Sequence, residues 1–229
     1  MLSAVFLVAM RLPASVQRPE RQSFLADVKR GVHEVAARTW LWSAFITFSL
    51  SNLSIAAYFV LGPLVVQTEL GGASDWGLML TGGAAGGLLG SAVALRYRPA
   101  RPLVPAFALM LATSLQLLAL IPPLPVPALM AASMCAVAGI AIGNALWETM
   151  LQQHVPQETI SRVSSLDWMV SLVFMPLGYV VVGPVSEAIG VHATLAGAAA
   201  LGAVANLGVL LVPSARTLRR LDEPAPATA

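Results

Sequence analysis

Six long apolar stretches, separated by short connections rich in polar residues, proline or glycine, make up most of this 229-residue chain. Each stretch is near the roughly 20 residues that an α-helix needs to cross the hydrocarbon of a bilayer. The pattern therefore predicts an all-α membrane protein with six transmembrane helices. We expect these spans at about 39–66, 73–95, 102–121, 125–150, 163–184 and 190–212.

The segments outside the spans predict different structures. Residues 1–10 are apolar but too short to span a bilayer. Within 23–38, apolar residues recur at helical spacing between charged ones, which predicts an amphipathic helix on the membrane surface, with a solvated linker as the alternative. The tail at 213–229 ends in alternating proline and alanine and is predicted to be disordered.

Positive charge alternates along the chain and predicts its orientation. From the amino terminus onward, the segments outside the spans carry six, zero, three, zero, one, zero and three Lys or Arg residues. Cytoplasmic loops carry the excess of these residues in polytopic proteins. We therefore expect a multi-pass protein of the plasma (inner) membrane with both termini in the cytoplasm, surrounded by lipid.

Composition agrees with this class of protein and argues against others. Hydrophobic residues make up 57% of the chain and charged residues 10%, against about 25% charged in a soluble domain. The net charge of +2 comes from arginines and one lysine that serve as an orientation signal, so no nucleic-acid partner is expected. We find no phosphate-binding loop, paired metal ligands or nucleophile motif, and predict neither an enzyme, a cofactor nor a metal site.

Glycines recur at four-residue spacing in two of the predicted spans. Small residues at this spacing let two helix backbones approach closely in lipid. We expect tight helix packing there, and a sliding or gating seam is the alternative. The glycines concerned are Gly82, Gly86, Gly90, Gly139 and Gly143.

Three stretches carry a resemblance to a known family. A glycine-rich second span leads into Arg96-Tyr97-Arg98-Pro99-Ala100-Arg101-Pro102, the fourth span leaves through Asn144-Ala145-Leu146-Trp147-Glu148-Thr149, and Pro176-Leu177-Gly178-Tyr179 lies in the fifth. From residue 23 onward the chain resembles the carboxy-terminal half of a major facilitator superfamily transporter of the bacterial drug and siderophore exporter type.

The resemblance implies a half of a twelve-span secondary active exporter. Residues 1–10 would be the end of a preceding helix and 11–38 the central cytoplasmic loop. Such a protein would expel small drug-like or siderophore-like compounds in exchange for protons by alternating access. Its partners would be an amino-terminal six-helix half, or a second copy of the chain, and a small-molecule substrate. The alternative is a truncated protein that does not transport, or an interaction scaffold.

Polar and charged residues inside the spans are the candidate functional groups. Asn52, Tyr58 and Asn144 are expected to line a substrate cavity if they face the bundle axis. A carboxylate in lipid is costly, so Glu148 and Asp167 should have cationic partners or lie at the interface. We expect Glu148 to pair with an arginine in one state of a cytoplasmic gate, and a static ion pair is the alternative. The gate candidates are Arg96, Arg98, Arg101, Glu148, Arg162 and Asp167, and the tryptophans expected in interfacial belts are Trp40, Trp42, Trp76 and Trp168.

Overall fold

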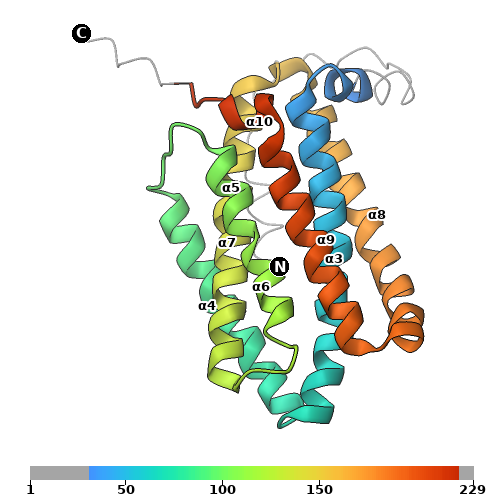
Figure 1. Ribbon diagram of the computed structural model, residues 1–229. Coiled ribbons are helices and arrows are strands. Elements are labelled where there is room, and N and C mark those ends of the chain that lie inside the picture. The colour runs from blue at the N-terminus through green and yellow to red at the C-terminus, as the bar shows by residue number, and fades with distance from the viewer. Residues whose placement is uncertain (1–30, 222–229) are drawn as a thin grey trace, which may run out of the picture.

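A computed structural model describes residues 31–221, apart from the side chains of residues 171 and 172, and it is a helical bundle (Figure 1). Five of its helices are long and apolar enough to cross a membrane, and α5 with α6 forms a shorter apolar segment. The prediction of an all-α membrane protein is confirmed. The helices are α3 (Thr39–Glu69), α4 (Ala73–Ala94), α5 (Leu103–Met110), α6 (Ala112–Leu118), α7 (Val126–His154), α8 (Gln157–Ile189), α9 (Val191–Leu211) and α10 (Pro213–Thr217).

Two helices differ from the spans expected at 102–121 and 163–184. The first is divided into α5 and α6, because the backbone at Leu111 tightens into bonds to the third residue back, and the Leu111 N–H donates to the Ala108 carbonyl at 3.3 Å. The second begins at Gln157, since its polar first turns continue the helix beyond the apolar stretch. Apolar periodicity locates the part of a helix in hydrocarbon and misses a polar extension.

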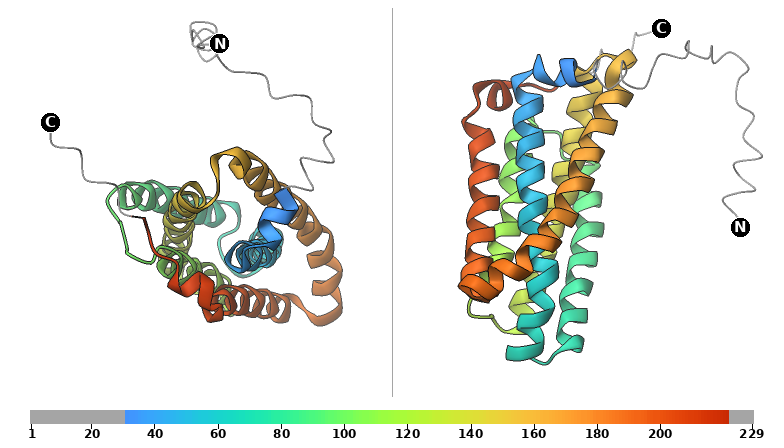
Figure 2. Two further views of the ribbon diagram at one scale, coloured as in Figure 1. Left: turned by 90° about the horizontal axis from the view of Figure 1, so that it is seen from above. Right: turned by 90° about the vertical axis from the view of Figure 1, so that its right-hand side faces the viewer.

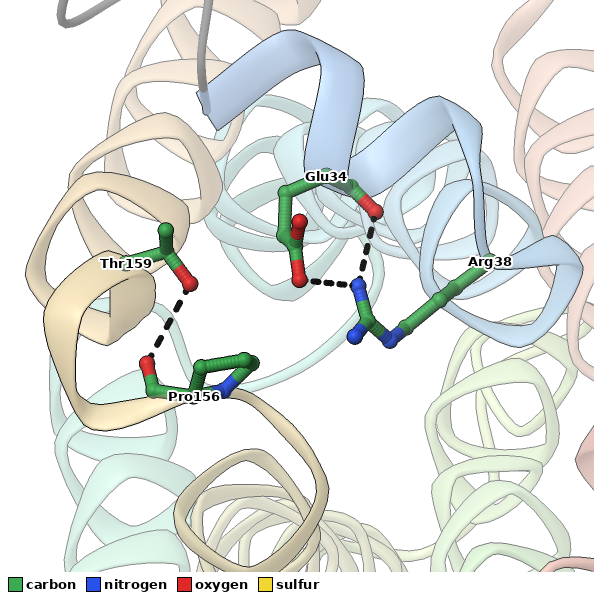
Figure 3. A network of polar contacts seen from close by, with 4 residues as sticks. All are labelled: Glu34, Arg38, Pro156 and Thr159. Carbon is green, nitrogen blue, oxygen red and sulfur yellow. Dashed lines mark hydrogen bonds and ion pairs between the residues drawn. The ribbon is translucent and has the colours of Figure 1, made fainter.

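The helical residues before α3 and the first turns of α8 lie together at one end of the bundle. Residues 31–36 are helical, and a methyl group added at Gly31 would lie 2.9 Å from Leu166 Cδ1 of α8. Figure 3 shows the Arg38 guanidinium donating to the Glu34 carboxylate, and the Thr159 hydroxyl donating to the Pro156 carbonyl in the first turn of α8. The earlier part of the predicted amphipathic helix, and the stub at 1–10, lie outside the described residues.

The prediction of disorder from residue 213 onward is wrong at its start. Residues 213–217 form α10, and Ala215 is buried against the bundle. The chain then continues to Leu221, whose backbone N–H donates to Gln153 Oε1 at 3.1 Å while Gln153 Nε2 donates to the Leu221 carbonyl at 3.3 Å. These contacts with the end of α7 order a segment whose composition alone favours disorder, and 222–229 lie outside the described residues.

Helix α3 is the central element of the bundle. Seen from above in Figure 2, the other helices surround it. Its buried side chains belong to two apolar clusters, one at each end: Trp40 and Leu41 pack with α5 and α7, while Leu61 and Val65 pack with α4, α6 and α9. Helix α3 therefore contributes to the apolar core at both ends of the bundle, as α7 and α9 also do.

The arginines of the described region lie at one end of the bundle. All eight within 31–221 fall before α3, between α4 and α5, in the first turns of α8, or after α9. In Figure 1 these segments lie toward the upper end, opposite the turns that join α3 to α4 and α8 to α9. The alternation of charge along the sequence thus becomes a separation of charge in space.

The glycines of α4 bring its backbone against that of α7. A methyl group added at Gly82 or Gly90 would lie 2.6 Å from a carbonyl oxygen of α7, closer than any side chain can approach, and at Gly86 closer still. Gly139 meets the Leu109 carbonyl of α5 in the same way, whereas Gly143 lies against the Met110 side chain, so α7 is packed between α4 and α5. The facing pairs on α4 and α7 are Gly82 with Met130, Gly86 with Met134 and Gly90 with Ala138.

We predict that Gly86→Ala destabilises the protein by about 1–3 kcal/mol, because the added methyl group overlaps the Met134 carbonyl and forces the helices apart. Gly77→Ala in the same helix is the matched control, since an added methyl group there meets no atom within 4 Å. Denaturant unfolding in detergent, followed by circular dichroism, measures both. Equal stability of the two variants would contradict the role given to the glycine contact.

Candidate functional site

A cavity of about 370 Å³ lies among α3, α5, α6, α7 and α8. Its volume is within the range of about 300–1,000 Å³ typical of small-molecule sites. The lining combines aromatic rings, aliphatic chains, amides, hydroxyls and two carboxylates, and includes no Lys, Arg or His. The residues are Phe48, Ser51, Asn52, Ile55, Met110, Thr113, Ile140, Asn144, Trp147, Glu148, Asp167 and Trp168.

Two of the three predicted cavity residues lie at this cavity. Asn52 of α3 and Asn144 of α7 both line it. Tyr58 does not: its side chain is buried, and its hydroxyl lies 3.2 Å from Ser133 Oγ, which also accepts a hydrogen bond from Gln116 Nε2 at 3.0 Å. Tyr58 therefore belongs to a separate polar cluster that connects α3, α6 and α7.

The structure brings Glu148 and Asp167 to the same cavity from facing helices. Asp167 is only 9% exposed, and its Oδ2 accepts a hydrogen bond from Trp147 Nε1 at 2.9 Å. Within residues 31–221, Glu34 pairs with Arg38 and the Glu69 carboxylate lies 3.1 Å from His192 Nε2, and neither cavity acid makes such a contact with a basic side chain. For Asp167 we expected a cationic partner or a position at the interface, and the structure gives it a neutral indole donor instead.

Aromatic rings hold Trp147 in position behind the cavity. Its ring centroid lies 5.6 Å from that of Trp40, 6.2 Å from that of Phe45 and 5.0 Å from that of Phe48, all edge to face. Such pairs contribute about 0.5–1.5 kcal/mol each beyond burial. Trp40 was expected in an interfacial belt, but it is buried in this cluster, whereas Trp42 and Trp168 are exposed.

Sequence reasoning missed the bond between Trp147 and Asp167, although both residues stood in the stretches that it singled out. The two lie on different helices, and no spacing rule connects them. One signal was available in the sequence. Asp167 was predicted inside a span, where a carboxylate requires a partner, and the Trp147 indole N–H can only donate a hydrogen bond.

The Major Facilitator Superfamily family model matches residues 1–178 of the chain. The chain belongs to the major facilitator superfamily. The resemblance drawn from its glycine, arginine and proline motifs is thereby confirmed.

Curated relatives give a narrower likeness. The chain is 27% identical over 234 residues to the multidrug efflux pump Tap of Mycobacterium tuberculosis (strain ATCC 25618 / H37Rv) and to that of Mycobacterium bovis (strain BCG / Pasteur 1173P2), covering 95% of this chain and 53% of each relative. It is 28% identical over 189 residues to Tap of Mycolicibacterium fortuitum, with 77% of this chain and 44% of the relative covered. The chain spans about half the length of the curated relatives it matches. No solved structure matches it significantly.

We predict that Trp147→Phe destabilises this superfamily member by about 1–3 kcal/mol, because it leaves the buried Asp167 carboxylate without its donor while keeping an aromatic ring. Trp168→Phe is the control, since Trp168 is 64% exposed and makes no such bond. Unfolding in detergent measures the difference. If both variants are equally stable, the hydrogen bond contributes nothing to the fold.

Proposed function

We propose that the chain forms the carboxy-terminal half of a secondary active exporter, which expels small drug-like compounds in exchange for protons. The observation that carries the proposal is its similarity, along 95% of its length, to half of a multidrug efflux pump. The protein is then a transporter, not an enzyme. A siderophore-like compound is the second substrate class that the exporter resemblance suggests.

The cavity among α3, α7 and α8 is proposed as this half's contribution to the substrate pathway. Its polar groups stand among aromatic and aliphatic side chains, the lining that a drug-sized compound requires. Alternating access would expose such a cavity to one side of the membrane at a time as two six-helix halves rock against each other. The opposite wall would come from an amino-terminal half or from a second copy.

We further propose that this half sits in the plasma membrane with both termini in the cytoplasm. The separation of the described arginines to one end supports this orientation. Cys135 is the single cysteine of the chain, so a Cys135→Ser background allows single-cysteine mapping.

In that background, Ser74→Cys is predicted to react with a membrane-impermeant maleimide in intact cells, because residue 74 lies in the first turn of α4, at the end proposed to face outward. Ala100→Cys, in the arginine-bearing connection between α4 and α5, should react only after the cells are opened. Both positions are exposed, so accessibility within the fold does not distinguish them. The reverse labelling pattern would contradict the orientation.

A cytoplasmic gate is proposed at the arginine-bearing end. Glu148 lies close to that end of α7, and the arginines before α5 and at the start of α8 lie on the same side. We propose that Glu148 pairs with one of them in one state of the transport cycle, and that the static structure captures another state. The members of this gate would be Arg96, Arg98, Arg101, Glu148, Arg162 and Asp167.

We predict that inverted vesicles from cells that coexpress the chain with a six-span amino-terminal half accumulate a fluorescent drug when a proton gradient is imposed. Accumulation in inverted vesicles corresponds to efflux from intact cells. Little efflux is expected from the chain alone, because a single half supplies one wall of the pathway. Glu148→Gln, tested in the same vesicles, should change the rate if the residue belongs to the gate.

Insertion of each protein is verified by protease protection before transport is measured. Gradient-dependent efflux by the chain alone would instead indicate a second copy as the partner. No efflux in either case would contradict the transport proposal and favour a scaffold. Unchanged rate and unchanged balance of inward and outward states in Glu148→Gln would contradict the gate.

A further inference from the structure

Two basic segments from distant parts of the sequence meet at one end of the bundle. The segment after α10 reaches the connection between α4 and α5, where the Arg220 N–H donates to the Ala100 carbonyl at 3.1 Å (Figure 2). Leu221 is held by two hydrogen bonds to the Gln153 side chain, and Leu218 packs against the apolar cluster at this end. The fold therefore holds residues 96–101 and 216–221 next to each other.

The two segments together form a basic patch. They carry six arginines and no Asp or Glu. Five of the six side chains are exposed and that of Arg220 is half-buried, and none of the six forms an ion pair with a carboxylate within residues 31–221. Positive charges that are held together without a negative partner repel one another, so the arrangement favours binding of an anion. The members of the basic patch are Arg96, Arg98, Arg101, Arg216, Arg219 and Arg220.

The chemistry of the patch suits a phosphate group. The guanidinium group of arginine is planar and can donate two parallel hydrogen bonds to phosphate oxygens. Several such groups, each exposed and without a carboxylate partner in the described part of the chain, are available here. The patch can therefore surround one phosphate group with donors from both segments.

The position of the patch favours a phosphate carried by a lipid. Helices α4 and α9 both have the length and composition of a membrane span, and the basic segments lie just beyond their ends at Ala94 and Leu211. Clusters of roughly four to eight basic residues directly beyond a transmembrane helix are typical of sites for anionic lipids. Leu95 and Leu211 are 77% and 78% exposed, so acyl chains can pack beside them. A soluble anion would use the arginines but not this apolar surface.

We propose that the basic patch binds the phosphate headgroup of an anionic phospholipid, with arginines of both segments donating to it and its acyl chains beside the ends of α4 and α9. The segment after α10 then has a role of its own, because it completes a site that neither segment forms alone. The inference goes beyond the proposed function and does not depend on it, since binding requires only that a headgroup reach this end of the bundle.

The test compares lipids that differ in the charge of the headgroup. The full chain in a non-ionic detergent is titrated with dioleoyl phosphatidylglycerol or with dioleoyl phosphatidylcholine, and native mass spectrometry gives the affinity of each. We expect saturable binding of phosphatidylglycerol, at least about tenfold tighter than that of the zwitterionic lipid. Raising the ionic strength should weaken this binding, because salt screens exposed charges.

A third arm separates a lipid from a soluble phosphate. Glycerophosphoglycerol carries the same headgroup and charge as phosphatidylglycerol but has no acyl chains. We expect it to compete with the lipid only weakly, because it lacks the contacts with the apolar ends of α4 and α9. Competition as strong as that of phosphatidylglycerol itself would overturn the assignment to a lipid and indicate a soluble phosphate compound instead.

Charge-neutral variants locate the site. Arg101→Gln and Arg219→Gln each remove one charge, from different segments, and we expect each to weaken phosphatidylglycerol binding by about fivefold. Arg38→Gln is the matched control, because it removes the same charge at the same end of the bundle, where the Glu34 carboxylate compensates it. It should leave the affinity unchanged.

Other outcomes overturn the inference. Equal affinity for the two lipids, or full affinity in both Arg101→Gln and Arg219→Gln, would contradict an anionic-lipid site here. Equal weakening in Arg38→Gln would indicate attraction to the net charge of the protein and not to this patch. Loss of affinity in Arg101→Gln alone would contradict the part given to the segment after α10. Size-exclusion profiles and unfolding midpoints verify the fold of each variant, and if Arg219→Gln does not fold, Arg220→Gln tests the same segment.

Discussion

The absence of water from the hydrocarbon of a bilayer is the constraint on which this structure depends. Backbone N–H and C=O groups at that depth must be bonded within the chain, and helices satisfy them segment by segment. Once the helices are formed, apolar burial no longer drives them together, because lipid is as apolar as their side chains. Close contact between helices must then come from complementary surfaces. The glycines of α4 and α7 provide these, because a residue without a side chain lets the neighbouring backbone approach closely.

The same constraint sets the cost of polar groups within the bundle. Serine, threonine, asparagine and glutamine side chains between the helices mostly bond to a carbonyl one turn back or to a side chain across the interface. Asn206, with no exposed surface, donates both to Ser51 Oγ at 3.1 Å and to the Gly202 carbonyl at 2.8 Å. The bond to Ser51 connects α9 to α3, and the bond to Gly202 lies within α9. The more costly carboxylates at the cavity are the exception.

The exception indicates where function is expected. Replacing buried ion pairs by apolar residues of similar volume often leaves stability unchanged or raises it. A buried acid that serves only the fold is therefore expected to be replaceable by an apolar residue such as leucine. Asp167 is instead held by an indole, which an aromatic cluster from α3 and α5 holds in turn. A rigid support behind a partly open carboxylate is the arrangement that a binding site needs, because orientation is then established before the ligand arrives.

Much of this protein followed from its sequence alone. Apolar stretches of spanning length determine the class and the helices, and the alternation of arginines places the positively charged connections of the described region at one end. The family likewise followed from local motifs. These features depend on residues that are close together in the chain. The length of an apolar stretch, its periodicity and the charge of a connection can all be read from such residues without knowledge of the fold.

The tertiary structure alone decided which side chains meet. Asn52 and Asn144 share a cavity while Tyr58, equally polar and on the same helix as Asn52, turns toward Ser133. Trp40 is buried among aromatic rings instead of lying in a belt, and residues 213–217, at the start of the tail, form α10. The physical reason is that a helix distributes its residues around its whole circumference, so the rotation and packing of its neighbours determine whether a given side chain faces a cavity, another helix or lipid.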